Sequence, residues 1–228
     1  MDIIISLGGS LIVPDKIDVA FLKKFHTLIT NFIKKGNRAI IITGGGKTCR
    51  RYQEAAQKIG PVSEEELDWI GIATTRLNAQ FLRTIFEKDA DHVVIKNPEA
   101  KINWKKSILI GAGWVPGHST DKDAVLLAKN LNINTIINLT NVDQVYDKDP
   151  KKHKDATPLD KMTWPELQAI VGEEWSPGLN APFDPIATKD ATALKLKVVI
   201  MGPDLKNLEN FLDDKEFKGT VIKPKYSI

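Results

Sequence analysis

Cysteine is almost absent from this sequence of 228 residues, which holds only Cys49. A single thiol excludes an intramolecular disulfide framework and suits a reducing compartment. Long apolar runs are also missing, since no stretch reaches the roughly 18 apolar residues of a membrane span. The apolar residues 3–13 lack a basic flank and a small-residue cleavage site and are broken by Gly8 and Gly9, unlike a signal peptide. We therefore expect a cytoplasmic protein with no membrane partner.

Charge of one sign is lacking as well. Lys and Arg number 32 against 29 Asp and Glu, and the formal net charge of +3 is spread along the chain. A nucleic-acid binder needs its basic side chains gathered in a patch or stripe, so we expect no nucleic-acid partner. With 42% hydrophobic and 27% charged residues, the composition is that of a globular protein. The length suits one domain over residues 1–228.

Several common catalytic signatures are missing. Gly46-Lys47-Thr48 resembles the end of a P-loop, but that motif needs glycine where Ile41 stands. The dinucleotide fingerprint G-x-G-x-x-G fails at both candidate positions, on Cys49 and on Pro116. No G-x-S-x-G nucleophile elbow is present. The histidines are too far apart for metal-ligand spacing, and we expect no protein-held metal; they are His26, His92, His118 and His153.

Short β-branched runs alternate with longer amphipathic stretches from end to end. This alternation predicts parallel strands joined by crossover helices. The runs are continuous in hydrophobicity, as strands covered on both faces must be. They span residues 3–5, 39–42, 92–95, 108–110, 135–137 and 198–200. We therefore expect an α/β fold with a helix-covered, mainly parallel central sheet.

Residues that accept hydrogen bonds from free backbone N–H groups mark the expected helix starts. Asp18 precedes an apolar helical pattern, and Ser63 with Glu66 and Thr163 with Glu166 form capping boxes. Between roughly residues 140 and 160 the chain is polar, which predicts a long surface excursion. Long polar loops in compact domains tend to carry function.

Two glycine clusters follow directly on expected strands, Gly8-Gly9-Ser10 on the first and Gly44-Gly45-Gly46 on the second. Open α/β sheets bind ligands at the carboxyl edge of their strands, where the following helices present free N–H groups and a positive dipole end to an anion. Glycine lets the backbone approach phosphate oxygens and adopt positive φ. A tight turn would explain either cluster alone, but two on one edge favour phosphate binding.

The ordered set of motifs resembles the amino-acid kinase superfamily, and most closely the archaeal-type uridylate (UMP) kinases. Each motif alone is common, but the set with similar spacings is specific and runs through the whole chain. The motifs are Gly8-Gly9-Ser10, Gly44-Gly45-Gly46-Lys47 with Arg50-Arg51-Tyr52, Asp68-Trp69-Ile70-Gly71, Pro116-Gly117-His118-Ser119-Thr120-Asp121, residues 141–146 with Asp149-Pro150, and Asp184-Pro185-Ile186-Ala187.

The resemblance implies a three-layer αβα sandwich whose N-terminal half binds the acceptor and whose C-terminal half binds ATP. It implies transfer of the γ-phosphate of ATP to UMP in pyrimidine biosynthesis, with Mg²⁺ accompanying ATP, in a cytoplasmic homohexamer. One alternative keeps the fold but takes isopentenyl phosphate, carbamate or an amino-acid carboxylate as acceptor. Another is a non-catalytic oligomer that binds nucleotide and stores an oxyanion. Asp68 argues for a sugar-bearing acceptor, and the retention of Asp184 and of the full segment from Asn141 to Asp149 argues against storage.

Motif by motif, the resemblance implies residues for each substrate. ATP would be held by Gly9, Ser10, Gly45, Arg50, Thr140, Asn141, Tyr146 and Asp149. UMP would be held by Gly44, Asp68, Val115, Pro116, Gly117, His118, Ser119, Thr120 and Asp121. The catalytic residues would be Asp184, Lys189, Lys47 and Arg50.

A phosphate monoester acceptor needs little chemical activation by the protein. Its second pKa is about 6, so its oxygen is a nucleophile at neutral pH without a general base. The protein has mainly to bring two anions together and neutralise their charge. Lys47, Arg50 and Lys189 can supply the positive charge, and Asp184 can orient the cations.

Some of these residues also have structural explanations. Lys47 and Arg50 could belong to an exposed basic helix start, although cations oppose the helix dipole there. Asp184 before Pro185 is also a good N-cap, and Ser119 could cap the helix that follows it. A cap and a phosphate cradle use the same N–H groups, so both roles can hold.

The main departure from the superfamily is Ser6, which stands where many members carry a phosphate-bridging lysine. Archaeal-type uridylate kinases share this absence. Which cation neutralises the transferring phosphoryl group is therefore open, with Lys189 and then Lys47 as the first candidates. The motifs assign no role to residues 97–106.

Overall fold

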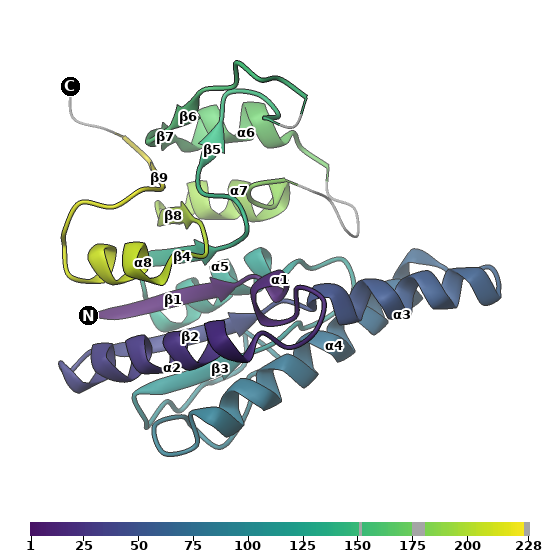
Figure 1. Cartoon of the computed structure of the whole chain (residues 1–228), viewed down its shortest axis with the longest axis horizontal. Coiled ribbons are helices and arrows are strands. Elements are labelled where there is room, and N and C mark those ends of the chain that lie inside the picture. Colours follow the sequence, from purple (N-terminus) through teal and green to yellow (C-terminus); the bar gives the residue numbers. More distant parts are fainter. Residues whose placement is uncertain (151, 175–180, 226–228) are drawn as a thin grey trace.

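The computed structural model describes residues 1–150, 152–174 and 181–225. Its main sheet has seven strands in the order β3-β2-β1-β4-β8-β9-β7 (Figure 1). The strands are β1 (Asp2–Leu7), β2 (Arg38–Thr43), β3 (Ile108–Gly111), β4 (Thr135–Leu139), β7 (Lys161–Thr163), β8 (Lys197–Met201) and β9 (Thr220–Lys223). All neighbouring pairs are parallel except β8 and β9. The expected mainly parallel sheet is confirmed.

Helices cover both faces of the sheet. One hydrophobic cluster joins the sheet to α2, α4 and α8, and a second joins it to α5, α6 and α7. The helices are α1 (Gly9–Ile12), α2 (Val19–Lys34), α3 (Gly46–Ile59), α4 (Glu64–Ile85), α5 (Thr120–Leu131), α6 (Trp164–Val171), α7 (Pro185–Ala193) and α8 (Leu205–Leu212). The result is the expected three-layer αβα sandwich.

The central strand β1 shows why the apolar runs are continuous. Ile3 and Ile5 lie in the first cluster and Ile4 in the second, and all three are fully buried. Successive strand side chains point to opposite faces, so a strand between two helical layers needs apolar residues at every position. Each buried isoleucine contributes about 1.5–3 kcal/mol through removal of apolar surface from water.

The expected helix starts are confirmed by their hydrogen bonds. The Asp18 carboxylate accepts from the Phe21 N–H at 2.9 Å at the start of α2. Ser63 Oγ accepts from the Glu66 N–H at 3.3 Å at the start of α4. At α6, the Glu166 carboxylate accepts from the N–H of Thr163 at 2.7 Å. Each bond satisfies a donor that the first helical turn leaves free.

The strand expected at residues 92–95 is wrong. Only Ala90 and Ile95 form bridges to β3, one on each side of a stretch that leaves the sheet. Val93 is 67% exposed, whereas Val94 packs against the first hydrophobic cluster and Ile95 against the second, so the run is only partly enclosed. An apolar run at the edge of a sheet has a neighbour on one side only, which leaves its conformation less constrained than that of a central strand.

Residues 97–106, which had no expected role, pack beside this edge. The side-chain amide of Asn130 donates to two of their backbone carbonyls, at 2.7 and 2.8 Å. The Arg38 guanidinium lies 4.0 Å from the centroid of the Trp104 ring. Trp104 also packs against the second hydrophobic cluster. The segment therefore has a structural role at the β3 edge of the sheet.

The polar excursion contains a short antiparallel hairpin of β5 (Val145–Tyr146) and β6 (Pro158–Leu159). Thr220, which is fully buried on β9, joins this hairpin to the main sheet. Its hydroxyl accepts from the Val145 N–H at 2.8 Å and donates to the Leu159 carbonyl at 2.5 Å.

None of the helices in the described residues is long and apolar enough to cross a membrane.

Replacing Thr220 by the isosteric valine tests this connection. Thr220→Val leaves the buried Val145 N–H and Leu159 carbonyl without their partner, so we expect a loss of about 1–3 kcal/mol of unfolding free energy. For a chain of this size that corresponds to a melting temperature lower by roughly 2–4 °C per kcal/mol, measured by calorimetry. Thr27→Val, at an exposed hydroxyl on α2, is the control. Equal melting temperatures for the two variants would contradict the role of Thr220.

Candidate active site

The strand order determines which loops are neighbours at one edge of the sheet. The parallel strands β3, β2, β1, β4 and β8 all end at this edge. Each strand is followed in the chain by one segment at this edge. In the order of the strands, these segments are residues 113–119, 44–46, 8–10 and 140–143, and Gly202. The residues that the resemblance implies for acceptor, shared phosphates, donor phosphates and adenosine therefore succeed one another along the edge.

The two glycine turns touch each other, backbone against backbone. The Gly44 N–H donates to the Leu7 carbonyl at 3.0 Å. A Cβ on Gly9 would overlap the backbone of Gly44 and Gly46, and a Cβ on Gly44 would lie 2.5 Å from the Gly9 nitrogen. Gly46 also has a φ of +68°, which favours glycine. Contact between the turns is therefore a second reason for glycine here, besides the approach of phosphate.

Asn78 on α4 holds the second glycine turn and was not singled out in the sequence. Its side chain is 5% exposed, and its amide donates to the carbonyls of Gly44 at 2.7 Å and Gly45 at 3.3 Å. The available signal was a polar stripe on the buried face of an amphipathic helix, since Thr74 and Thr75 are buried there too. Buried polar groups need partners, and here the partner is the turn.

The loop of residues 113–119 is anchored to α4. The Asp68 carboxylate accepts from the Gly117 N–H at 2.8 Å. The Arg76 guanidinium donates to the carbonyls of Gly113 at 3.3 Å and Trp114 at 2.9 Å. Asp68 and the loop, both expected to hold the acceptor, are thus brought together. The remaining loop residues expected there are exposed at Gly117 and half-buried at Val115, Pro116, His118, Ser119 and Thr120.

Ser119 caps α5, because its hydroxyl accepts from the Lys122 N–H at 3.1 Å. The capping explanation offered for this residue is therefore confirmed. The other free N–H groups of the first turn of α5 remain suited to an anion.

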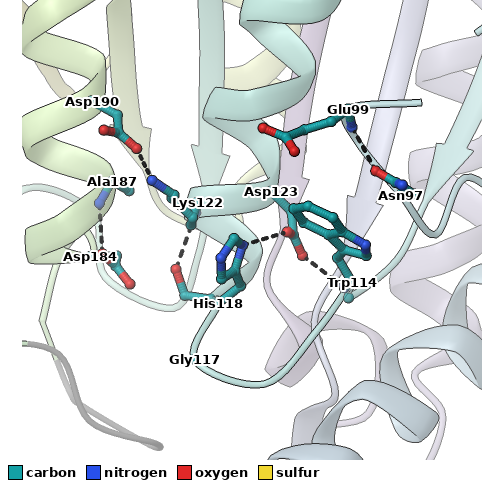
Figure 2. Close-up of polar contacts among 12 residues, drawn as sticks. Asn97, Glu99, Trp114, Gly117, His118, Lys122, Asp123, Asp184, Ala187 and Asp190 are labelled. Atoms are coloured by element: carbon teal, nitrogen blue, oxygen red, sulfur yellow. Dashed lines mark hydrogen bonds and ion pairs between the residues drawn. The ribbon is translucent and has the colours of Figure 1, made fainter. Parts of the chain in front are cut away.

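Asp121 and Asp184 lie close together beside β1, the strand that leads into the first glycine turn. Ser6 on β1 donates its hydroxyl to Asp121 Oδ1 at 3.3 Å, and the Asp184 N–H donates to Asp121 Oδ2 at 3.2 Å. Asp184 also caps α7, since its Oδ1 accepts from the Ala187 N–H at 2.7 Å (Figure 2). Burial and the neighbouring Asp184 charge raise the pKa of Asp121 to about 7. Asp121, grouped by the resemblance with the acceptor residues, lies between Ser6 and Asp184.

The candidate cations differ in availability. Lys189 forms an ion pair with Glu173 at 3.2 Å, and its side chain is 50% exposed. Lys122 pairs with Asp190 between α5 and α7 (Figure 2). Lys47 and Arg50 form no ion pair with any residue that the structure describes. They are free to meet an anion.

On the other side of the first glycine turn lie the residues expected to hold adenosine. The Gly8 N–H donates to the Leu139 carbonyl at 2.8 Å, which joins this turn to β4. Thr140 continues from β4, and its N–H donates to the Met201 carbonyl at 3.0 Å. Asn141 is exposed directly after it. Tyr146 lies in β5 and Asp149 follows on the hairpin, which Thr220 ties to the sheet.

No group of three or more acidic, His or Cys side chains gathers as a metal site in residues 1–150, 152–174 and 181–225. His26 instead stacks on Phe86, with ring centroids 4.7 Å apart. Burial raises the pKa of the Cys49 thiol, which favours the inert thiol over a reactive one.

The half-buried Asp121 predicts a pH-dependent stability of the ligand-free protein. Its folded pKa lies above its unfolded value, so between about pH 4 and 7 the folded state keeps a proton that the unfolded chain has lost, and stability falls as pH rises. Asp121→Asn carries no such charge. We expect its melting temperature, relative to the original protein, to be about 5 °C higher at pH 8 than at pH 4.5, measured by calorimetry in EDTA. A pH-independent difference would contradict this placement of Asp121.

Comparisons with known proteins cover the whole chain. The amino acid kinase family matches residues 1–202. Uridylate kinase of Thermoplasma volcanium is 38% identical over 226 residues, which is 98% of each chain. The crystal structure of uridylate kinase from Archaeoglobus fulgidus matches with a TM-score of 0.84 at 32% identity, over 97% of this chain and 100% of that chain. Aspartate kinase from Synechocystis shares the fold, with a TM-score of 0.73 at 16% identity over 100% of this chain and 40% of that chain. The chain belongs to the amino acid kinase family.

Proposed function

We propose that this protein is a UMP kinase, which transfers the γ-phosphate of ATP to UMP and yields UDP and ADP. The order of loops along the sheet edge carries the proposal, because the acceptor loop, the two glycine turns and the adenosine segment follow one another. An in-line transfer requires this order of acceptor, two phosphates and donor nucleoside. The uridylate kinases named above align with nearly the whole of this chain.

Acceptor binding would use the Asp68 carboxylate. One oxygen accepts from the Gly117 N–H, which orients the group and leaves the other oxygen for the two hydroxyls of a ribose. Isopentenyl phosphate and carbamate carry no such hydroxyls. An unmatched carboxylate in their site would cost binding energy, so Asp68 favours a nucleotide acceptor.

Phosphate binding would fall to the glycine turns and the free cations. Backbone N–H groups of Gly9, Ser10 and Gly45 would hold ATP phosphates, while Gly44 faces the acceptor. Lys47 and Arg50 stand at the start of α3, where the helix dipole disfavours cations unless an anion is present. Two phosphate groups supply that anion. The protein then stabilises the transition state by position and charge, with no general base.

Mg²⁺ would enter bound to ATP. It takes few protein ligands, commonly one or two carboxylates together with substrate phosphates. This fits the described residues, in which no three acidic, His or Cys side chains gather as a metal site. When bound, it neutralises charge on the β- and γ-phosphate oxygens. Asp184 would orient the cations around the transferred group, since only one of its oxygens is engaged in capping α7.

We also propose one domain over residues 1–228, with an acceptor-binding N-terminal half and an ATP-binding C-terminal half, in a cytoplasmic homohexamer. Support for association comes from α3, which projects from the body of the molecule and has no buried residue (Figure 1). Tyr52 and Ile59 on α3 are 65% and 89% exposed, and Leu77 on α4 is 62% exposed. Large exposed apolar side chains on two neighbouring helices suit contact with a second copy.

The acceptor is tested by ADP release from Mg-ATP with UMP, CMP, isopentenyl phosphate and carbamate in turn. We expect UMP to give a kcat/KM at least about 100-fold above isopentenyl phosphate and carbamate, because only a nucleotide satisfies Asp68. Turnover with another acceptor and none with UMP would show a different kinase. Nucleotide binding without any turnover would favour the storage protein.

The role of Asp184 is tested by Asp184→Asn, which keeps the cap on α7 because an amide oxygen also accepts the Ala187 N–H. We expect kcat to fall about 100-fold or more with little change in ATP affinity, since the lost charge acts on the transferring group. Asp204→Asn, at the exposed cap of α8, is the matched control and should leave kcat unchanged. Equal losses of turnover and affinity in Asp184→Asn would show a structural role only.

A further inference from the structure

Asp123 is a second buried carboxylate and has no part in the transfer described above. It lies in the first turn of α5 and is 1% exposed. Its Oδ2 accepts from the Trp114 N–H at 3.2 Å. Its Oδ1 makes no hydrogen bond with the described residues and lies 3.6 Å from His118 Nδ1, which is buried and equally without a partner (Figure 2).

The groups around Asp123 indicate which nitrogen of His118 carries the ring proton. Burial raises the pKa of Asp123, while His118, the Trp114 N–H and the nearby Lys122 lower it. The Lys122 ammonium is itself paired with Asp190. An imidazole proton on Nδ1 would satisfy both unpartnered atoms, because a contraction of well under 1 Å brings them to ordinary hydrogen-bond length. The His118 ring also packs edge-on against Trp114, with centroids 5.2 Å apart.

This contact closes the acceptor loop on itself. Asp123 binds Trp114 near the start of residues 113–119 and His118 near their end, so both limbs of the loop are fixed to α5. The tip is fixed separately, through the Gly117 N–H bond to Asp68. The Asp68 bond fixes only the tip, so the shape of the two limbs depends on the Asp123 contacts.

We propose that His118 is a positioning residue of the acceptor site, whose Nδ1–H bond to Asp123 holds residues 113–119 in the form that receives UMP. The proposal rests on the UMP kinase function. It differs from direct contact between His118 and UMP, for which the ring would use Nε2. The two roles require different nitrogens of the same ring.

Two amide substitutions separate these nitrogens. The side-chain amide of His118→Asn can place a donor near the position of Nδ1, and that of His118→Gln reaches the position of Nε2. We expect His118→Asn to keep the KM for UMP within about twofold, and His118→Gln to raise it about tenfold by leaving a buried carboxylate oxygen unpaired. The KM for ATP should change less than twofold in both. His92→Gln, at an exposed histidine, is the control and should match the original protein.

The opposite pattern, with His118→Gln unaffected and His118→Asn impaired, would overturn the proposal in favour of direct contact. Unchanged UMP KM in both variants would overturn it as well, as would parallel increases for UMP and ATP, which indicate general damage. The original protein is assayed first. If it does not phosphorylate UMP, the proposed function fails; if it does while His118→Gln is unaffected, only the positioning role fails.

A measurement independent of turnover is the protonation of the His118 ring, read from long-range ¹H–¹⁵N NMR spectra. We expect the proton on Nδ1 in the original protein. In Asp123→Asn the side-chain amide oxygen still accepts from the Trp114 N–H, and the side-chain NH₂ group faces His118 Nδ1. Because an NH₂ group donates, Nδ1 must then accept, and the ring proton should move to Nε2. A bare Nδ1 in the original protein, or an unchanged ring in the variant, would overturn the proposal.

Discussion

The contact between the two glycine turns determines the geometry of the edge on which the candidate site lies. The strands β1 and β2 are adjacent and parallel, so the chains leaving them run into the same space. They fit because Gly9 and Gly44 lack a Cβ, which would overlap the facing backbone. Asn78 fixes the second turn from α4 by binding its carbonyls. Any side chain at these positions would separate the turns and, with them, the two phosphates they are proposed to hold.

Strand order extends this constraint to the other loops. The acceptor loop follows β3, beyond the second glycine turn, and the adenosine segment follows β4, beyond the first. The distance between the substrates is therefore set by the spacing of hydrogen-bonded strands rather than by flexible loops. Catalysis by positioning needs rigid supports of this kind, because small displacements of the reacting groups cost large factors in rate.

Much of this arrangement could be predicted from the sequence. Continuous apolar runs predicted the central strands because those strands are buried on both faces, and Asp18 and Ser63 predicted helix starts because capping is local. The run at residues 92–95 failed because an edge segment is not enclosed in the same way, and Val93 is exposed. The contacts of Ser6 with Asp121 and of Asn78 with the glycine turn join residues far apart in the chain. No local pattern specifies such a partner.

Serine instead of lysine at position 6 affects both the neighbouring Asp121 and the source of positive charge for the phosphates. A lysine there would bring positive charge next to Asp121 and would favour its ionised form. With serine, burial and the neighbouring Asp184 charge raise the pKa of Asp121 to about 7, and the Ser6 hydroxyl and the Asp184 N–H offset this rise only in part. Positive charge for the phosphates then has to come from elsewhere. Lys47 and Arg50 are unpaired in the described residues and stand beside the second glycine turn, so they can bind phosphate without losing another contact.

Lys189, the first candidate from the sequence, is not eliminated by its ion pair. Its partner Glu173 is 76% exposed, and an exposed pair of this kind contributes roughly 0–1 kcal/mol. A phosphate dianion in a desolvated site attracts an ammonium group more strongly than a solvated carboxylate does. Lys189 can therefore exchange Glu173 for phosphate at little cost, whereas Lys122, 16% exposed and paired with Asp190 between two packed helices, would lose a partly buried contact. The availability of each lysine thus follows from the burial of its present partner.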